Sequence, residues 1–232
     1  MTHSATALEL IQAIEQADSS ERLIVAVRAL AAARLEAGIS PLIAVLGYNN
    51  PTAALAAVEG LVQMGEVAVP ALLAQIDDYN YGARAYSIRA LAAIADPQAL
   101  EILLAAAETD FAPSVRRAAI KGLGALHWDQ LPTERIPAAQ AQTLKILLLI
   151  SQDPEWSIRY AAVVGLQSLT AAIGPERPDF WPKILVRFEQ MAKADPDLTV
   201  RARVWMAQQQ LQRLVRPCLS NVEKALFTQA KS

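Results

Sequence analysis

The stretch Arg159 to Leu166, with the sequence RYAAVVGL, decides the fold because variants of it occur elsewhere in the chain. Arg84 to Leu91 and Arg116 to Leu123 also begin with Arg, carry alanine shortly after it and have Leu at the seventh following position. An Asp lies six residues before each of four such arginines: Asp78 and Arg84, Asp110 and Arg116, Asp153 and Arg159, and Asp195 and Arg201. These arginines are 32, 43 and 42 residues apart. Repeats of this length predict a helical solenoid.

Each repeat divides into two predicted helices joined by a polar turn. The first helix is short and apolar and often begins at proline, which suits the first helical turn because its missing N–H is not needed there. The expected first helices are 41–46, 70–76, 99–107, 142–150 and 182–192. The second helix carries the arginine, and two weaker copies, Leu23 to Leu30 and Ala54 to Leu61, lack it. We therefore expect an all-α, HEAT-like solenoid of about five to six helical hairpins, continuous as one domain over residues 1–232.

The repeated Asp and Arg predict polar contacts between layers. The Asp can cap the helix that follows it, and the Arg can reach the Asp of its own or the neighbouring repeat. The long interval before Arg159 predicts an inserted loop at 128–142, and a similar loop is expected at 174–182. Trp128 and Trp156 are expected to fill gaps in the stacking there. Residues from about Cys218 onward are expected to form a cap or a tail.

Composition favours a folded protein without a membrane span. The chain is 53% hydrophobic, yet no apolar run reaches the roughly 18 to 20 residues of a membrane helix without a charge, proline or turn. The first residues, Met1 to Ser4, carry no basic segment before an apolar core, which argues against a secretory signal. A single cysteine, Cys218, fits a reducing compartment. We therefore expect a cytoplasmic protein.

Charge is distributed unevenly along the chain. The net charge is −8 for residues 1–111, +1 for 112–200 and +5 for 201–232. The acidic first half would repel phosphate groups, so the sequence does not favour a nucleic-acid partner. The polarity suits a protein partner, although solvated surfaces produce the same pattern.

Few residues suggest autonomous catalysis. The two histidines, His3 and His127, form no metal-spaced cluster with cysteine, and the sequence has no glycine-rich phosphate loop or nucleophile elbow. We therefore expect neither a metal site nor a cofactor.

One turn departs from ordinary HEAT sequence. The stretch Asp78 to Ala85, DYNYGARA, places Tyr79, Tyr81 and Gly82 at the start of the helix that carries Arg84. Aromatic faces and free helix N–H groups on one rim could hold a flat, anionic ligand. Packing of the tyrosines against the next layer is the alternative.

The segment Tyr81 to Ala85, YGARA, together with Tyr48 to Pro51, YNNP, and Ser114 to Ala119, SVRRAA, resembles the F-type subunits of the HEAT-repeat E/F phycobilin lyase family. The resemblance covers about residues 8–130 in detail. It implies a cytoplasmic subunit that works with an E-type partner. The pair would attach phycocyanobilin, a linear tetrapyrrole, through a thioether to a cysteine of the phycocyanin α subunit, without cofactor, nucleic acid or membrane. A noncatalytic HEAT scaffold or chaperone in phycobilisome assembly or turnover is the alternative.

Several side chains become candidates through this resemblance. A bilin carries two propionates, for which Arg is the natural two-point partner, and a conjugated ring system that stacks on aromatic side chains. The candidate residues for binding ligand or partner are Tyr79, Tyr81, Gly82, Arg84, Arg89 and Arg117. The candidate acids that could keep the tetrapyrrole protonated are Asp77, Asp78, Asp110 and Glu155.

For these arginines a structural role is the alternative. Arg84 occupies the repeated ladder position, whereas Arg89 and Arg117 lie outside it and could be plain exposed charges. Related lyases that also isomerise the bilin carry a His-Cys pair in this subunit. Here Trp128 follows His127, which favours attachment without isomerisation.

Overall fold

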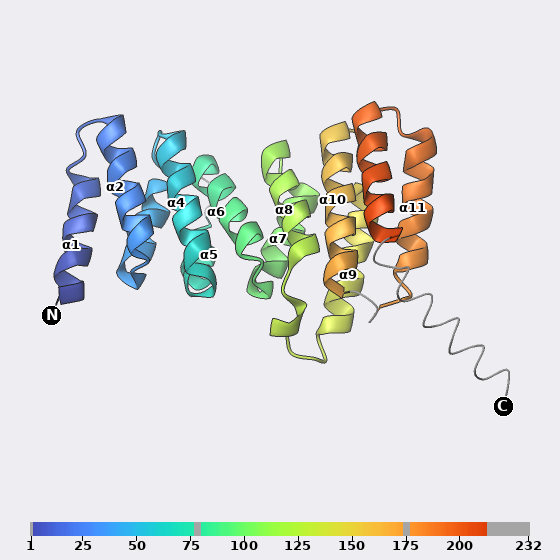
Figure 1. Cartoon of the computed structure of the whole chain (residues 1–232), viewed down its shortest axis with the longest axis horizontal. Coiled ribbons are helices and arrows are strands. Elements are labelled where there is room, and N and C mark those ends of the chain that lie inside the picture. The colour runs from blue at the N-terminus through green and yellow to red at the C-terminus, as the bar shows by residue number, and fades with distance from the viewer. Residues whose placement is uncertain (1, 77–79, 174–176, 213–232) are drawn as a thin grey trace. The chain divides into compact units, whose positions relative to one another are not determined.

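The computed structural model describes residues 2–76, 80–173 and 177–212 (Figure 1). Every regular element in these ranges is helical, so the all-α prediction is confirmed. The chain divides into two compact units, Met1–Ala106 and Ala107–Ser232. Within each unit the helices stack as hairpins. The expectation of one continuous domain stays a prediction.

The first unit is built on three long helices that pack in sequence. These are α2 (Ser20–Ala33), α4 (Pro51–Met64) and α6 (Tyr81–Ile94), and α1 (Thr2–Glu15) packs on α2. Two short helices, α3 (Ile39–Val45) and α5 (Val69–Ala74), follow the 3-10 turns η1 (Glu36–Gly38) and η2 (Gly65–Ala68). The short helices lie against α4 and α6, respectively. Their positions agree with the first helices expected at 41–46 and 70–76.

Local sequence explains where the long helices begin and why they pack closely. Asn50 Oδ1 accepts a hydrogen bond from the N–H of Ala53 at 3.0 Å, which caps α4. Pro51 occupies the first turn of that helix. On the same helix Gly60 faces Ala31 of α2, and a Cβ added to Gly60 would lie 2.5 Å from the Ala31 Cβ. Small residues thus let the layers approach.

The apolar run 51–74 does not form a continuous membrane-length helix. Its composition and length would allow a span, because the run has 24 residues and an 18-residue window within it has a mean hydropathy of 1.4. The run is broken at Gly65, whose φ is +69°. It therefore forms α4, the turn η2 and the short helix α5. Neither of the two α-helices reaches the roughly 20 residues that a bilayer requires.

The second unit repeats the hairpin arrangement. The turn η3 (Pro97–Ala99) precedes α7 (Leu100–Thr109), in which the boundary between the units falls. The following helices are α8 (Pro113–Ala125), α9 (Ile136–Ile150), α10 (Trp156–Ile173), α11 (Trp181–Ala194) and the last described helix, 198–212. Helix α10 packs on α8, α9 and α11. The backbones of α8 and α10 come close, because a Cβ on Gly124 would lie 2.1 Å from the carbonyl oxygen of Gly165.

Arginine and aspartate side chains join successive repeats of this unit. Arg116 Nη2 lies 2.8 Å from Asp153 Oδ2. Arg159 binds both carboxylate oxygens of Asp195, through Nε and Nη2, at 2.8 Å each. Each Arg therefore binds the Asp of the following repeat, and the predicted ladder is confirmed here. Arg201 donates in addition to the carbonyl oxygen of Asp195 at 2.8 Å.

The pair of Arg159 and Asp195 is buried, with 7% and 6% of each residue exposed. Burial raises the pKa of the Asp195 carboxyl, but the hydrogen bonds from Arg159 and from the N–H of Asp197 lower it more, so the net pKa lies below its ordinary value. The hydrogen bond to Asp195 also raises the pKa of Arg159 against the opposing effect of burial. Both groups thus favour the ionised form.

Two of the repeated aspartates, Asp110 and Asp153, do not cap the following helix as expected. Asp110 and Asp153 instead accept the N–H two residues later, from Ala112 at 2.8 Å and Glu155 at 2.9 Å. This is the geometry of an Asx turn, in which the side chain closes the bend before the helix begins. The carboxylate can then bind the arginine of the preceding repeat with its other oxygen.

The loop expected at 128–142 is shorter than predicted. Residues Trp128–Gln130 form the 3-10 turn η4, and α9 begins at Ile136, so that 136–142 is helical. Pro137 lies in the first turn of α9, where proline is compatible with a helix. Part of the loop expected at 174–182 and all residues from Cys218 lie outside the described residues, and α11 begins at Trp181.

Candidate functional site

The start of α6 carries the described part of the predicted aromatic rim. Asn80 Oδ1 accepts from the N–H of Ala83 at 3.1 Å and fixes the beginning of the helix. Tyr81 is 40% exposed, and the Arg84 guanidinium carbon lies 5.9 Å from the centre of its ring. At this distance a cation and an aromatic face attract each other. Tyr81 and Arg84 are thus brought together at one end of α6.

The other candidates of this segment differ in placement. Gly82 is exposed, and a Cβ there would meet only Asn80 Oδ1 at 3.8 Å. Arg89 is exposed further along α6. Asp77, Asp78 and Tyr79 lie outside the described residues, so their predicted roles stay predictions.

Arg117, the remaining candidate, lies in a groove of the second unit. The groove has a volume of about 480 Å³. Its lining comes from α8, from the turn and first residues of α10, and from the last described helix: Arg117, Glu155, Trp156, Ser157, Tyr160 and Thr199. We call it the Arg117 groove. Glu155, one of the candidate acids, shares it, whereas Asp110 is not part of its lining.

A polar network holds Arg117 at the groove. Its Nη1 donates to Ser157 Oγ at 3.1 Å and lies 3.9 Å from Glu155 Oε1. The Ser157 hydroxyl donates in turn to Glu155 Oε1. The side chains of Arg117 and Glu155 remain 37% and 40% exposed. The guanidinium therefore faces solvent at a fixed position, and a carboxylate arriving from solvent could reach it.

Two aromatic side chains flank this network, and sequence reasoning misplaced one of them. Trp156 was expected to fill a gap between layers, but it is 47% exposed, whereas Trp128 is 5% exposed and does lie in the core. The reason is its repeat position, three residues before the ladder arginine. Tyr81 and Leu198 hold the same position and are exposed at 40% and 70%. A comparison of repeats at this position could have identified Trp156.

Tyr160, the second aromatic residue, is supported from the last described helix. The Arg203 guanidinium carbon lies 6.0 Å from the centre of the Tyr160 ring. Arg203 also donates to Gln167 Oε1. Burial lowers the pKa of Arg203, with a smaller opposing effect from Tyr160. Tyr160 is thus a half-buried, positioned aromatic face rather than a freely moving one.

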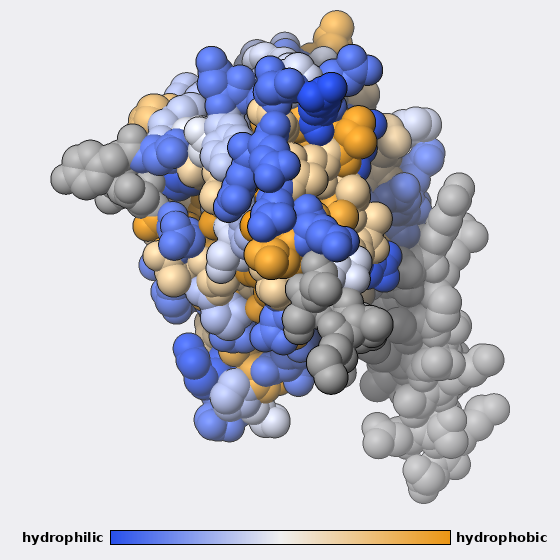
Figure 2. Space-filling model, turned by 90° about the vertical axis from the view of Figure 1, so that its left-hand side faces the viewer, coloured by the Kyte–Doolittle hydropathy of each residue, from blue (hydrophilic) through white to orange (hydrophobic). Residues whose placement is uncertain are grey.

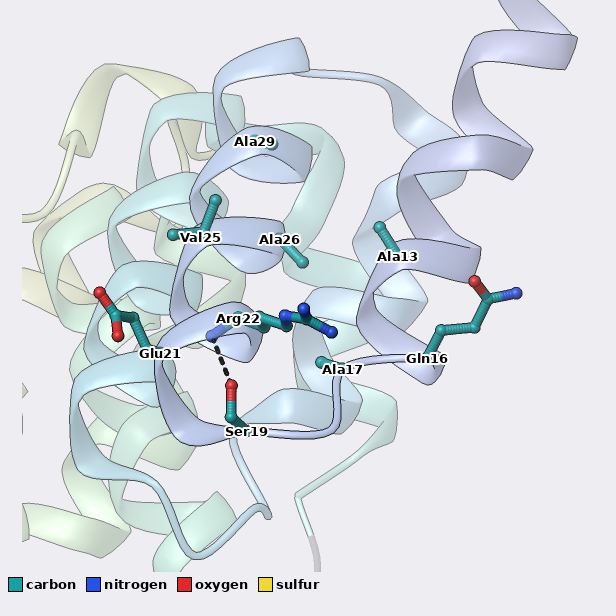
Figure 3. Close-up of a pocket in the computed structure, with 9 residues that line it drawn as sticks. All are labelled: Ala13, Gln16, Ala17, Ser19, Glu21, Arg22, Val25, Ala26 and Ala29. Atoms are coloured by element: carbon teal, nitrogen blue, oxygen red, sulfur yellow. Dashed lines mark hydrogen bonds between the residues drawn. The ribbon is translucent and has the colours of Figure 1, made fainter.

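A second hollow, between α1 and α2, is less suited to a ligand (Figure 3). Its volume is about 670 Å³, and much of its lining is alanine: Ala13, Ala17, Ala26 and Ala29. Glu21 and Gln16 point away from it, and Arg22, which points into it, is paired with Asp18 at 3.0 Å. On the face drawn in Figure 2, which is the side of the molecule where α1 lies in Figure 1, hydrophilic and hydrophobic side chains are interspersed. The hollow offers no convergent set of polar groups.

The described residues offer little for covalent or metal chemistry. No three His, Cys, Asp or Glu side chains among them come together as metal ligands. His127 is exposed beside the turn η4, and Cys218 lies outside the described residues. What the Arg117 groove can do is bind: it presents aromatic faces, a cation and a carboxylate in one place.

Comparison with known proteins agrees with the repeats and identifies the family. The HEAT-repeat family model matches residues 69–167. A protein of Nostoc sp. named phycocyanobilin lyase subunit beta is 58% identical over 202 residues, which are 87% of this chain and 98% of that protein. The chain belongs to the family of phycocyanobilin lyase beta subunits. The family resemblance inferred from the YGARA segment is thereby confirmed.

Two further relatives are similar over most of the chain. A Synechocystis protein named phycocyanin alpha phycocyanobilin lyase CpcF is 54% identical over 160 residues, covering 69% of this chain and 75% of that protein. A chain in the solved complex of CpcE and CpcF of phycocyanin lyase from Nostoc sp. has 61% identity and a TM-score of 0.69, covering 74% of this chain and 98% of that one.

Solved structures outside the family show the fold alone. A designed armadillo repeat protein in complex with a peptide is 18% identical with a TM-score of 0.58, and covers 87% of this chain and 97% of that one. Stacked helical hairpins are therefore shared with proteins of unrelated sequence.

Proposed function

We propose that this chain is one subunit of a heterodimeric phycobilin lyase that attaches phycocyanobilin to a cysteine of the phycocyanin α subunit. The observation that carries the proposal is the match to the phycocyanobilin lyase beta subunit of Nostoc sp. at 58% identity over 98% of that protein. The Synechocystis relative supports the acceptor, because its name specifies phycocyanin alpha. The reaction would take place in the cytoplasm.

The partner is an E-type subunit. The solved relative at 61% identity is part of a complex of CpcE and CpcF. Partner dependence also fits the chemistry of the described residues, which lack a metal cluster and present binding groups rather than a nucleophile.

Thioether formation does not require a nucleophile from the lyase. The acceptor protein supplies the thiol, which adds across the double bond of the bilin's ethylidene group. The S–H bond and the double bond break, a C–S bond forms, and one proton is added to the tetrapyrrole. The lyase then has to hold the bilin in an extended or bent shape and present it to the thiol. Positioning of two reactants can lower a barrier by about 7 to 11 kcal/mol, so binding residues are sufficient for this kind of catalysis.

The attached product is unchanged phycocyanobilin. The resemblance implies a His-Cys pair in isomerising relatives, whereas in this chain Trp128 follows His127 and the single cysteine, Cys218, is distant in sequence; Trp128 is only 5% exposed. A buried indole cannot move a proton along the bilin. We therefore expect ligation without isomerisation.

The experiment combines the purified chain, an E-type subunit, phycocyanobilin and phycocyanin α apoprotein. We expect a covalent, denaturation-resistant adduct only when both subunits are present, with the absorption of thioether-linked phycocyanobilin that has not been isomerised. Efficient ligation by this chain alone would contradict the heterodimer, and a product with the absorption of an isomerised bilin would contradict simple attachment.

A noncatalytic role in phycobilisome assembly is the second candidate. One relative, from Synechococcus elongatus, is named phycobilisome maturation protein, and is 47% identical over 97% of its length. A scaffold of this kind would bind phycocyanin but leave the yield of adduct unchanged. The same reconstitution decides between the two, because it measures covalent attachment directly.

A further inference from the structure

The Arg117 groove brings a partly exposed indole and a positioned cation together. Trp156 lies at the edge of the groove with 47% of its surface exposed. The cation of Arg117 is fixed a short distance away by Ser157 at 3.1 Å. A volume of about 480 Å³ lies within the roughly 300 to 1,000 Å³ that is usual for small-molecule sites.

The geometry of the polar network leaves room for a second carboxylate. The distance of 3.9 Å between Arg117 Nη1 and Glu155 Oε1 is longer than a hydrogen bond. Glu155 is therefore not a two-point partner of the guanidinium, and its nearer bond is to the Ser157 hydroxyl. A planar guanidinium favours two parallel bonds to a carboxylate, and an incoming carboxylate can form them here.

The aromatic faces define the rest of the ligand. Trp156 lies at the first position of α10, and Tyr160 follows one helical turn later, so both project from the same side of that helix. The Arg203 guanidinium carbon lies 6.0 Å from the centre of the Tyr160 ring, over one of its faces. Flat conjugated molecules stack on such faces. The groove thus fits a planar, conjugated molecule that also carries a carboxylate.

We propose that the Arg117 groove binds the linear tetrapyrrole, with a pyrrole ring against Trp156 and Tyr160 and a propionate on Arg117. This inference rests on the proposed lyase function and assigns the substrate to residues of this chain.

The test measures bilin binding and ligation separately, with the chain in complex with an E-type subunit. The groove variants are Trp156→Ala and Arg117→Gln. Matched controls are Trp205→Ala, because Trp205 is 60% exposed and does not line the groove, and Arg28→Gln, because Arg28 is an exposed arginine of α2 outside the candidate residues. Phycocyanobilin is titrated into each complex, and absorbance gives its Kd. Size-exclusion chromatography checks complex formation, and thermal unfolding checks the fold.

We expect each groove variant to bind phycocyanobilin about tenfold more weakly, equivalent to about 1.4 kcal/mol, while the two controls stay within about twofold. Arg117→Lys should recover part of the affinity, because it restores the charge but not the planar fork. If the wild-type complex forms no adduct, the proposed function fails. If it ligates normally and the groove variants bind bilin like the controls, only the groove assignment is overturned. Loss of the E-type subunit from the groove variants, with unchanged bilin affinity of the remaining complex, would instead make the groove a protein interface and overturn the assignment.

Discussion

At the scale of the residue, the carboxylate of Asp195 has two roles: it pairs with a buried arginine and it accepts a backbone hydrogen bond that closes a turn. It neutralises Arg159 through two bonds of 2.8 Å and also accepts the N–H of Asp197 at 3.0 Å. Asp195→Asn keeps the shape and the turn acceptor but leaves a buried guanidinium without its counter-charge. Because breaking a buried pair costs about 3 to 5 kcal/mol, we expect the free energy of unfolding in urea to fall by about 3 kcal/mol.

The control for this variant is an exposed pair of the same kind. Arg22 and Asp18 lie 3.0 Å apart, with side chains that are 71% and 68% exposed. Solvent screens such a pair, so Asp18→Asn should change the unfolding free energy by less than about 1 kcal/mol. A similar loss in both variants would show that burial of the ladder pair does not matter.

The lowered pKa of Asp195 predicts a dependence of stability on acid pH. Because the folded-state pKa lies below the ordinary value of 3.8, the unfolded chain binds more protons in the range between the two values. The contribution of Asp195 is therefore complete above the ordinary pKa and is lost as pH falls through the folded-state pKa. Urea midpoints from pH 6 downward should decline below about pH 4, and this decline should be shallower in Asp195→Asn. Identical profiles would contradict the assignment.

Single residues also show how far sequence reasoning reached. The ladder of Arg116 and Arg159 could be predicted because repetition reveals a shared position, and charge dictates the partner. The exposure of Trp156 was missed because a tryptophan near a long interval resembles a core residue. Only comparison with Tyr81, at the same repeat position, identifies its place at the start of a helix.

At the scale of the element, the contact between α8 and α10 depends on two glycines. A Cβ on Gly124 would lie 2.1 Å from the carbonyl oxygen of Gly165, and a Cβ on Gly165 would lie 2.6 Å from that of Ile120. Both obstacles are backbone atoms, which cannot rotate away. Gly124→Ala should therefore force the helices apart and destabilise the protein by about 1 to 3 kcal/mol, the usual cost of overpacking. Thermal or urea unfolding measures the change.

A glycine of the same chain without such a neighbour provides the comparison. A Cβ on Gly82 meets only Asn80 Oδ1 at 3.8 Å. Alanine there should be neutral or stabilise α6 by up to about 1 kcal/mol, because it reduces the freedom of the unfolded chain. Equal destabilisation by Gly82→Ala and Gly124→Ala would mean that helix propensity, and not helix contact, governs both positions.

Most element types could be predicted from the sequence, but one boundary could not. Helices recur with a period and an apolar side that the sequence displays directly. The start of α9 was placed six residues too late, because Pro132 and Pro137 resemble loop residues when the helix is unknown. Proline is compatible both with a loop and with the first turn of a helix. The sequence alone therefore does not decide whether 136–142 is helical, and the packing of this segment does. The Arg117 groove escaped prediction for a related reason: its residues come from three helices.

At the scale of the whole molecule, association with a second subunit should add to stability. A partner that binds only the folded chain shifts the unfolding equilibrium by about 2.7 kcal/mol at a concentration of 100 Kd. We expect the Tm of this chain to rise with the concentration of an E-type subunit, as measured by differential scanning calorimetry. A designed armadillo protein, with the same fold class, serves as the control and should leave the Tm unchanged. A Tm independent of the E-type subunit would contradict the heterodimer.

The spacing of the ladder has a consequence for synthesis on the ribosome. Arg159 precedes its partner Asp195 by 36 residues, and Arg116 precedes Asp153 by 37. A nascent chain therefore contains each cation before its counter-charge has been made. Arg159 finds carbonyl acceptors at Asp153 and Pro154 within its own hairpin, at 3.0 Å each, but because a charge without a counter-charge resists burial, we expect its remaining N–H groups to stay hydrated until the following hairpin leaves the exit tunnel. We therefore expect the hairpins of the second unit to complete their packing one after another during translation, as the aspartate of each new hairpin pairs with the arginine of the hairpin before it.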